Sequence, residues 1–356
     1  MMSRLTSRQR QILQLMQTKV GVSNAEIRAY FNQSEDPVSR VTIVRDLDAL
    51  RQAGWVQKHG AGRTVRYRLV LDNPLLQPFD PEAYFKVETD HRSILPTFNF
   101  EVFSHFSAEL FTPIELQKLT VLTQTYQKNL TEMSHELIRK ETERLTIELS
   151  WKSSQIEGNT YSLLDTEALI KDHREAPGHA KEEAIMILNH KLAIEYIRAQ
   201  AKDYRRLSVR KIEDIHRILI QGLPGVHHGI RNRLVRIVGT NYRPLDNAHQ
   251  LREALEHAVA LFNAKKITGF QKALSAIILL SYIQPFVDGN KRTARLVGNA
   301  ILHANQACPL SYRSIDPVDY KKAVLLFYEK NSLSYFKTLF IAQYEFSVAH
   351  YFSNGR

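Results

Sequence analysis

The spacing of apolar residues predicts a chain that is mainly helical after about residue 112. Before that point, three short amphipathic helical patterns precede two segments that alternate like strands, at 55–59 and 64–69. Beyond it, the one strand-like interruption runs from residue 229 to residue 244. The clearest later helical segments are 181–199, 209–221, 249–263 and 271–283. We therefore predict a small α+β domain followed by a larger, mainly α domain.

Side chains that can cap free backbone N–H groups mark where several helices begin. Ser23 and Glu26 form a capping box before the second helix, and Ser39 is placed to cap the third. Thr112 and Glu115 form another box, with a proline between them, where the helical domain begins. The preceding segment is rich in proline and aromatic residues, which favours a packed connector. The predicted organisation is a first domain at 1–71, this connector at 72–112, a helical domain at 113–345 and a tail at 346–356.

Composition and charge narrow the class of protein. The 356 residues are 44% hydrophobic, which is ordinary for a folded domain, and no apolar run reaches the ~20 residues of a membrane span. We therefore expect a cytoplasmic protein with no membrane partner. Residues 1–71 hold twelve lysines and arginines against five acidic residues, and so carry most of the net charge of +11. This concentration favours a nucleic-acid partner, although a solvated basic surface is the alternative.

The order of three helices and a basic hairpin resembles the winged helix-turn-helix domains of bacterial repressors. In that family the third helix enters the major groove of DNA and the hairpin wing contacts the phosphate backbone. Docking of another protein, or dimerisation, is the alternative use of the same fold. A homodimer is the expectation by analogy. The resemblance implies DNA contacts from Ser39, Arg40, Thr42 and Arg45 on the helix and from Lys58, Arg63 and Arg66 on the wing.

A turn that feeds a helix start creates an anion site near residue 289. Pro285 interrupts an apolar helix, and Asp288 and Gly289 lie in a turn before a new helix begins. Backbone N–H groups at a helix start have no partner within the helix, and the helix dipole adds positive potential. Arg292 and Arg295 lie on one face of that helix, close enough to clamp neighbouring phosphates. Proteins usually hold Mg²⁺ with a carboxylate beside a polyphosphate, and Asp288 can supply that carboxylate.

The string from residue 284 to residue 295 resembles the signature of Fic (Fido) proteins, His-x-Phe-x-Asp-Gly-Asn-[Gly/Lys]-Arg-x-x-Arg. The resemblance extends over roughly residues 113–340 and implies a helical bundle that binds ATP and Mg²⁺ and transfers AMP to a hydroxyl of a target protein. It implies that Asp288 holds Mg²⁺. It also implies nucleotide contacts from Gly289, Asn290, Lys291, Arg292 and Arg295. The matched positions are Phe286, Asp288, Gly289, Asn290, Lys291, Arg292 and Arg295.

Two further segments are similar to Fic motifs. Ser153, Glu157 and Gly158 match the inhibitory motif of self-restrained members, in which the glutamate pairs with the second arginine, here Arg295, and occupies the place of the γ-phosphate. Residues 229–244 resemble the flap, a β-hairpin that pairs with an extended target segment. This implies target contacts near the flap turn, at Val238, Gly239 and Thr240.

Gln284 stands where the family has its catalytic histidine. An amide cannot take the proton from an attacking hydroxyl, and loss of a general base typically costs ~10²- to 10⁴-fold in rate. His249 and Tyr282 are the nearest substitutes in sequence. Two hypotheses follow: an autoinhibited adenylyltransferase with weak or lost activity, coupled to DNA binding, or a catalytically inactive transcriptional regulator that senses a nucleotide.

Overall fold

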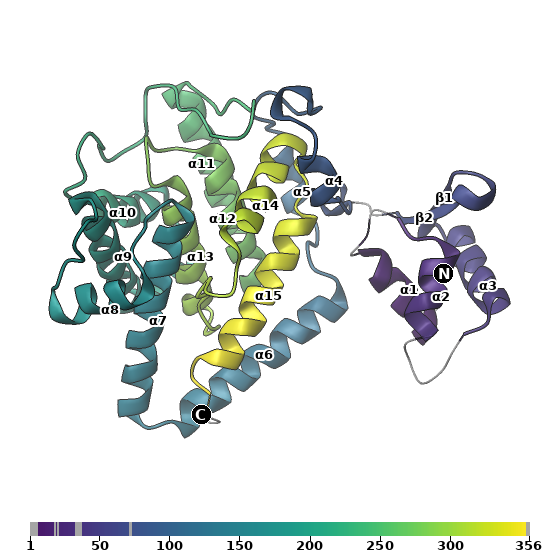
Figure 1. Ribbon diagram of the computed structural model, residues 1–356, viewed down its shortest axis with the longest axis horizontal. Helices are drawn as coiled ribbons and strands as arrows, with labels where there is room; N and C mark the ends of the chain where they lie inside the picture. Colours follow the sequence, from purple (N-terminus) through teal and green to yellow (C-terminus); the bar gives the residue numbers. More distant parts are fainter. Residues whose placement is uncertain (1–5, 18, 20, 33–37, 71–72, 354–356) are drawn as a thin grey trace. The chain divides into compact units, whose positions relative to one another are not determined.

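The computed structural model describes residues 6–17, 19, 21–32, 38–70 and 73–353. The described chain divides into two compact units (Figure 1). Unit 1 reaches to Arg92 and includes the short segment Asn331–Tyr335. Unit 2 comprises the remainder. The division falls inside the predicted connector, and residue 71, the predicted end of the first domain, lies outside the described residues.

Unit 1 begins with three helices and a two-stranded antiparallel sheet. Its core is one apolar cluster that includes Ile12, Ile43, Leu47, Val56 and Tyr67. The sheet pairs Val56 with Leu69 and His59 with Arg66, and Val22 forms a further bridge to Tyr67. The elements are α1 (Ser7–Gln17), α2 (Asn24–Asn32), α3 (Arg40–Gln52), β1 (Val56–His59) and β2 (Arg66–Leu69), followed by the short helix α4 (Pro81–Phe85).

The predicted caps in this unit are confirmed. The backbone N–H of Ser23 donates to Glu26 at 2.8 Å, and the N–H of Glu26 donates back to the Ser23 hydroxyl at 3.2 Å. The hydroxyl of Ser39 accepts from the N–H of Thr42 at 3.2 Å. Each bond satisfies an N–H that the first turn of a helix leaves without a partner, so these residues fix where α2 and α3 begin.

Unit 2 is a helical bundle, as the sequence predicts, with α12 and α13 in its middle (Figure 1). Its first helices are α5 (Val102–Phe106), α6 (Pro113–Glu132), α7 (His135–Ile156), α8 (Leu163–Asp172), α9 (Lys181–Ala199) and α10 (Val209–Ile220). The later ones are α11 (Ala248–Phe262), α12 (Gly269–Ile283), α13 (Asn290–Ala304), α14 (Pro317–Lys330) and α15 (Ser334–His350). The predicted box at the start of α6 is confirmed by reciprocal bonds between Thr112 and Glu115.

The pair α12 and α13 forms the core on which the site is built. Almost the whole of α12 is buried, as its apolar run predicts, and α13 is buried along most of its length. The two helices pack closely at Gly298, where a Cβ atom would lie 2.4 Å from Cγ1 of Ile277. Because close-packed protein interiors are hardly compressible, this contact fixes the position of α13 relative to α12. The loop between them is thereby held at both ends.

The predicted β-hairpin at 229–244 is not formed in the structure. The segment is extended, but none of its described residues pair with one another as strands, and its one bridge joins Arg243 to Thr97. Its backbone is bonded to the bundle instead, because the N–H of Arg231 donates to Pro285 and that of Arg243 donates to Pro96, both at 2.9 Å. A turn at Val238 and Gly239 remains. Among the described helices, none is long and apolar enough to span a bilayer.

Candidate functional site

The loop between α12 and α13 turns sharply through two left-handed residues. Gln284 ends α12 at φ 52° and Gly289 precedes α13 at φ 76°. Between them, Phe286 donates its backbone N–H to Oδ1 of Asn290, and Nδ2 of Asn290 donates to the Phe286 carbonyl, both at 2.8 Å. No side chain caps the start of α13. The first backbone N–H groups of α13 therefore stay available to an anion.

His216 of α10 supports this loop from beneath, a role that the sequence did not indicate. Its Nε2 lies 3.0 Å from the carbonyl oxygen of Asp288, to which it donates, and its ring stacks on Phe286 with centroids 3.7 Å apart. Burial lowers the pKa of His216 to about 4, so the imidazole is neutral near pH 7. The imidazole thus holds the loop by packing and one hydrogen bond, without adding charge.

Arg295 is fully buried, and residues of α7 and its C-terminal cap occupy all three of its side-chain nitrogens. Nε donates to the hydroxyl of Ser153 at 2.9 Å, and Nη2 donates to the Ser153 carbonyl at 2.8 Å. Nη1 donates to Oε1 of Glu157 at 2.9 Å. The structure therefore brings together the predicted partners Ser153, Glu157 and Arg295. Gly158, at φ 102°, lets the chain leave α7 directly after Glu157.

Glu157 lies between two cations. Besides Arg295, it accepts from Nζ of Lys291 at 3.1 Å. Burial by itself would raise the pKa of this carboxyl, but the charges of Arg295 and Lys291 outweigh it and lower the pKa to about 2. Glu157 is therefore ionised at any physiological pH. It places a fixed negative charge beside the anion-binding end of α13.

His190 of α9 completes this cluster, and no motif in the sequence pointed to it. Its Nε2 lies 2.8 Å from the Ser153 hydroxyl, and its ring is fully buried. Burial, together with the charges of Arg295 and Arg292, lowers the pKa of His190 well below its ordinary value. A neutral imidazole adds no further positive charge beside Arg295. It orients the serine that holds the Arg295 guanidinium.

Arg292 and Asp288 form a second pair at the same loop. Nη2 of Arg292 donates to Oδ2 of Asp288 at 3.0 Å, while the Asp288 side chain is 55% exposed. Nη1 of Arg292 is buried and has no hydrogen-bond partner within the described part of the chain. A buried donor without a partner is costly, which favours a ligand that supplies an acceptor there. An exposed carboxylate beside a phosphate site fits Mg²⁺, which takes one or two protein ligands and completes its shell with phosphate and water.

A cavity of about 340 Å³ opens over the loop. Val235, Ile237 and Val238 of the extended segment line one side of it. None of the described residues that line the cavity is a histidine. The polar lining that bears on its chemistry comes from Glu157, Gln284, Asp288, Asn290, Lys291, Lys321 and Tyr328.

The side chain of Gln284 is bonded to the end of its own helix. Its Nε2 donates to the carbonyl of Ser281 at 2.7 Å and to the hydroxyl of Tyr328 at 3.1 Å. The Tyr328 hydroxyl in turn donates to the same carbonyl at 2.6 Å. Burial raises the pKa of Tyr328 well above its ordinary value, so the phenol stays protonated. Neither side chain can accept a proton near pH 7.

Neither of the proposed substitute bases lies at this cavity. His249 is exposed near the start of α11. Tyr282 is buried, its hydroxyl accepts from the backbone N–H of Asn99 at 2.9 Å, and its ring stacks on Phe98 and Tyr242. Tyr328, which does line the cavity, lies on helix α14, where sequence alone gives it no distinguishing mark.

The base of the extended segment is held by Arg231, another residue that the sequence did not indicate. The side chain of Arg231 is 2% exposed and donates Nε to the Gln284 carbonyl at 2.7 Å. It also donates to the carbonyls of Arg233 and Leu245, one on each limb of the segment. Arg231 therefore joins both limbs to the loop, in place of the predicted strand pairing. Val238, at the turn, is 96% exposed, and Gly239 beside it has φ 85°. Thr240 is not paired in a strand, and its hydroxyl accepts from the N–H of Tyr242.

The candidate DNA contacts of unit 1 fall into two groups. Arg40, Arg45 and Lys58 are exposed, and no described residue lies within ion-pair distance of them. Ser39 and Thr42 bond each other at the start of α3, with hydroxyl oxygens 2.9 Å apart. Arg66 donates to Glu26 at 3.1 Å and to the Gly21 carbonyl at 2.9 Å, which joins the sheet to α2. The side chain of Arg63 lies outside the described residues.

Residues 206–302 match the sequence model of the Fic/DOC family. The chain is 28% identical over 153 residues to the protein adenylyltransferase Fic of Drosophila grimshawi, and 29% identical over the same length to that of Drosophila virilis. Each match covers 43% of this chain and 32% of the fly protein, so the chain spans about a third of the length of these relatives.

Solved structures show the same fold. The match to C. elegans Fic-1 has a TM-score of 0.56 at 21% identity and covers 67% of this chain and 71% of that one. A Fic domain signaling protein from Bacteroides thetaiotaomicron matches with a TM-score of 0.55 at 17% identity, over 65% of this chain and 95% of that one. Residues 206–302 are therefore similar to the Fic/DOC family, and about two-thirds of the chain has the fold of these solved Fic structures.

Proposed function

We propose that this Fic/DOC domain protein is an autoinhibited, ATP-binding regulator that is coupled to DNA through unit 1. ATP and Mg²⁺ occupy the cavity over the loop before α13. Glu157 restrains the bound nucleotide, and transfer of AMP to a protein is weak or lost. The observation that carries the proposal is the contact of Arg295 with Ser153 and Glu157, in which each side-chain nitrogen of that arginine donates one hydrogen bond.

The restraint follows from competition for one cation. A phosphate oxygen that binds Nη1 of Arg295 at the position of the Glu157 carboxylate must displace that carboxylate, which lies 2.9 Å from Nη1. The phosphate and the Glu157 carboxylate are both anions, so they repel each other unless the carboxylate moves away. Nucleotide binding and the Glu157 contact therefore oppose each other, and the position of α7 is coupled to the occupancy of the site.

The remaining groups supply the rest of a nucleotide site. Nη1 of Arg292 offers a donor without a protein partner, and the start of α13 offers backbone N–H groups. Lys291 leaves Glu157 for a phosphate when Glu157 moves. Asp288 would hold Mg²⁺, which neutralises phosphate charge when bound.

The chemistry of Gln284 favours binding over transfer. The relatives named protein adenylyltransferase support an AMP-transfer origin for the domain. In this chain, the amide of Gln284 donates hydrogen bonds to the Ser281 carbonyl and to the hydroxyl of Tyr328, whose phenol is protonated. Without a base, the attacking hydroxyl keeps its proton, and the rate falls by roughly 10²- to 10⁴-fold. A regulator without catalysis is the second candidate.

DNA is the proposed partner of unit 1. The exposed cations Arg40 and Arg45 on α3 and Lys58 on β1, together with the basic excess of residues 1–71, support contacts to phosphates. Arg66 is better described as structural, since it joins β2 to Glu26 and Gly21. A dimer would place two such units on two half-sites of an operator.

Intact-mass spectrometry after incubation with Mg-ATP tests the enzymatic half of the proposal. The samples are wild type, Glu157→Gly, and Glu157→Gly combined with Gln284→His; calorimetry measures ATP binding by each. We expect all three to bind ATP and only the histidine-restored protein to gain the mass of AMP readily. Gain of AMP by Glu157→Gly alone would show that glutamine is compatible with catalysis. Absence of ATP binding in all three would refute the nucleotide site itself.

Gel-shift selection from a random duplex library tests the DNA half. The wild type is compared with Arg45→Ala and with Arg210→Ala, which removes an exposed arginine of α10 in unit 2. Enrichment of a sequence by wild type and by Arg210→Ala, but not by Arg45→Ala, is the expected result. Equal behaviour of all three would assign unit 1 a role other than reading DNA.

A further inference from the structure

A second cavity, of about 480 Å³, lies within unit 2 away from the loop before α13. Its size is within the range of roughly 300–1,000 Å³ that is typical of small-molecule sites. Helices α6, α7, α9 and α13 and the segment after α15 line it, and most of its lining is apolar. Nothing in the proposed nucleotide chemistry uses this space.

Two of the helices that line this cavity, α7 and α13, also position Glu157 and Arg295. On α7 the lining residues Thr142, Leu145, Thr146 and Leu149 follow one face of the helix, and further steps of four residues lead to Ser153 and Glu157. On α13, His303, Asn299 and Leu296 follow one face back towards Arg295 and Arg292. The cavity is therefore an unfilled part of the same interface that the ion pair closes at its other end.

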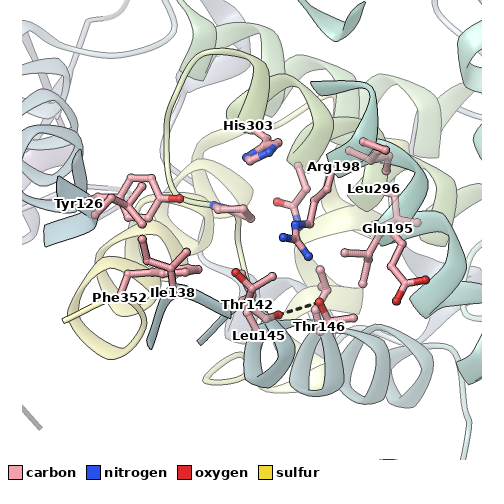
Figure 2. Close-up of a pocket in the computed structure, with 17 residues that line it drawn as sticks. Tyr126, Ile138, Thr142, Leu145, Thr146, Glu195, Arg198, Leu296, His303 and Phe352 are labelled. Atoms are coloured by element: carbon pink, nitrogen blue, oxygen red, sulfur yellow. Dashed lines mark hydrogen bonds between the residues drawn. The ribbon is translucent and has the colours of Figure 1, made fainter. Parts of the chain in front are cut away.

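One cation at the cavity has no protein partner. Arg198 of α9 is exposed at the cavity and makes no hydrogen bond or ion pair with any described residue, whereas the neighbouring Glu195 lies 3.8 Å from Lys191. Figure 2 shows the Arg198 side chain between His303 on one side and Thr142 and Thr146 on the other. Burial and the nearby Arg198 charge lower the pKa of His303, so Arg198 is the fixed positive charge of the lining.

We infer that this cavity binds a small amphipathic carboxylate, with its apolar chain among the leucine and isoleucine side chains and its carboxylate on Arg198. The threonine hydroxyls add hydrogen-bonding capacity beside the charge, although Thr146 already donates to the carbonyl of Thr142 at 2.8 Å. An apolar chamber with one unpaired guanidinium suits an apolar chain that ends in an anion. A neutral or cationic amphiphile would gain no attraction from this charge.

The ligand also acts on the nucleotide site, a step that rests on the proposed function. A chain inserted between α7 and α13 separates the two helices and stretches the contact between Glu157 and Arg295, which are 2.9 Å apart. Bound carboxylate therefore favours the arrangement in which Arg295 is open to a phosphate. By linkage, nucleotide in turn raises the affinity for the carboxylate by the same factor.

Calorimetric titration of the full chain with decanoate tests the site, with decanol and decyltrimethylammonium as neutral and cationic counterparts of the same chain. We expect saturable decanoate binding that Arg198→Gln weakens about tenfold. Arg210→Gln, at an exposed arginine outside the cavity, is the matched control. Thr142→Phe, which fills the space from a partly exposed position of α7, should abolish binding. No decanoate binding, or equal binding of decanol, or no effect of Arg198→Gln overturns the assignment.

The coupling is measured with a non-hydrolysable ATP analogue and Mg²⁺, with and without saturating decanoate. We expect decanoate to tighten nucleotide binding about fivefold in wild type and not at all in Glu157→Gln. Decanoate binding with unchanged nucleotide affinity would overturn the coupling and leave the site standing. Failure of nucleotide to bind under either condition would instead refute the proposed function, since the decanoate titration is read without nucleotide.

Discussion

Replacement of Glu157 by glutamine should tighten nucleotide binding, because it removes the charge that competes for Arg295. The neighbours of this carboxyl lower its pKa from 4.5 to about 2. At about 1.4 kcal/mol for each pKa unit, they favour the ionised form by roughly 3 kcal/mol. The side chain is 18% exposed and glutamine keeps an acceptor for Nη1, so the substitution removes only part of this interaction free energy. We expect roughly 1–2 kcal/mol, or about 5- to 30-fold in affinity.

The assay is calorimetric titration of each protein with a non-hydrolysable ATP analogue in the presence of Mg²⁺. Glu143→Gln is the matched control, since Glu143 is an exposed glutamate of the same helix that makes no contact with Arg295. Thermal unfolding of all three proteins checks that the fold is intact. If wild type, Glu157→Gln and Glu143→Gln bind the analogue equally, the carboxylate does not compete with phosphate and the proposed restraint is wrong.

The remaining predictions concern stability. Glu157, with its folded pKa lowered to about 2, adds stability that is present above pH 4.5 and is lost as the pH falls through 2, so urea unfolding should show the difference between wild type and Glu157→Gln shrinking across that range. Arg66→Ala should cost roughly 1 kcal/mol in the unfolding of unit 1, and Arg45→Ala less than about 0.5 kcal/mol, as measured by urea titration of tryptophan fluorescence. Gly298→Ala, whose Cβ would meet Ile277 at 2.4 Å, should cost roughly 1–3 kcal/mol by the same titration; an unchanged midpoint would show that α13 can shift.

The sequence predicted those parts of the site that are local in the chain. The turn through Asp288 and Gly289, and the helix that starts at Asn290, follow from breakers and spacing that adjacent residues supply. Glu157 was predicted from a motif, and its distance of 2.9 Å from Arg295 needed the fold. Helix bounds agree closely, since the segment predicted at 181–199 is α9 and that at 271–283 lies within α12.

What the sequence missed depends on side chains that meet across the fold. His190, His216 and Tyr328 lie in ordinary amphipathic or apolar helices, where periodicity marks them only as inward-facing. Arg231 was within the predicted flap, but strand-like alternation could not show that its guanidinium would join both limbs to Gln284. The hairpin prediction failed for this reason: alternation indicates extended backbone, whereas pairing depends on which groups accept the hydrogen bonds.

The position of Gln284 separates what this loop can bind from what it can catalyse. Its backbone, at φ 52°, closes α12 and gives its carbonyl to Arg231, so the residue is needed for the turn whatever its side chain does. Its amide donates to Ser281 and Tyr328, bonds that a proton acceptor could not make in the same way. The presence of glutamine in place of histidine at position 284 leaves Arg292 and Arg295 unaffected. A loop with its anion-binding groups in place and no base is suited to register whether a nucleotide is present, and α7, through Glu157, is the element that nucleotide binding would move.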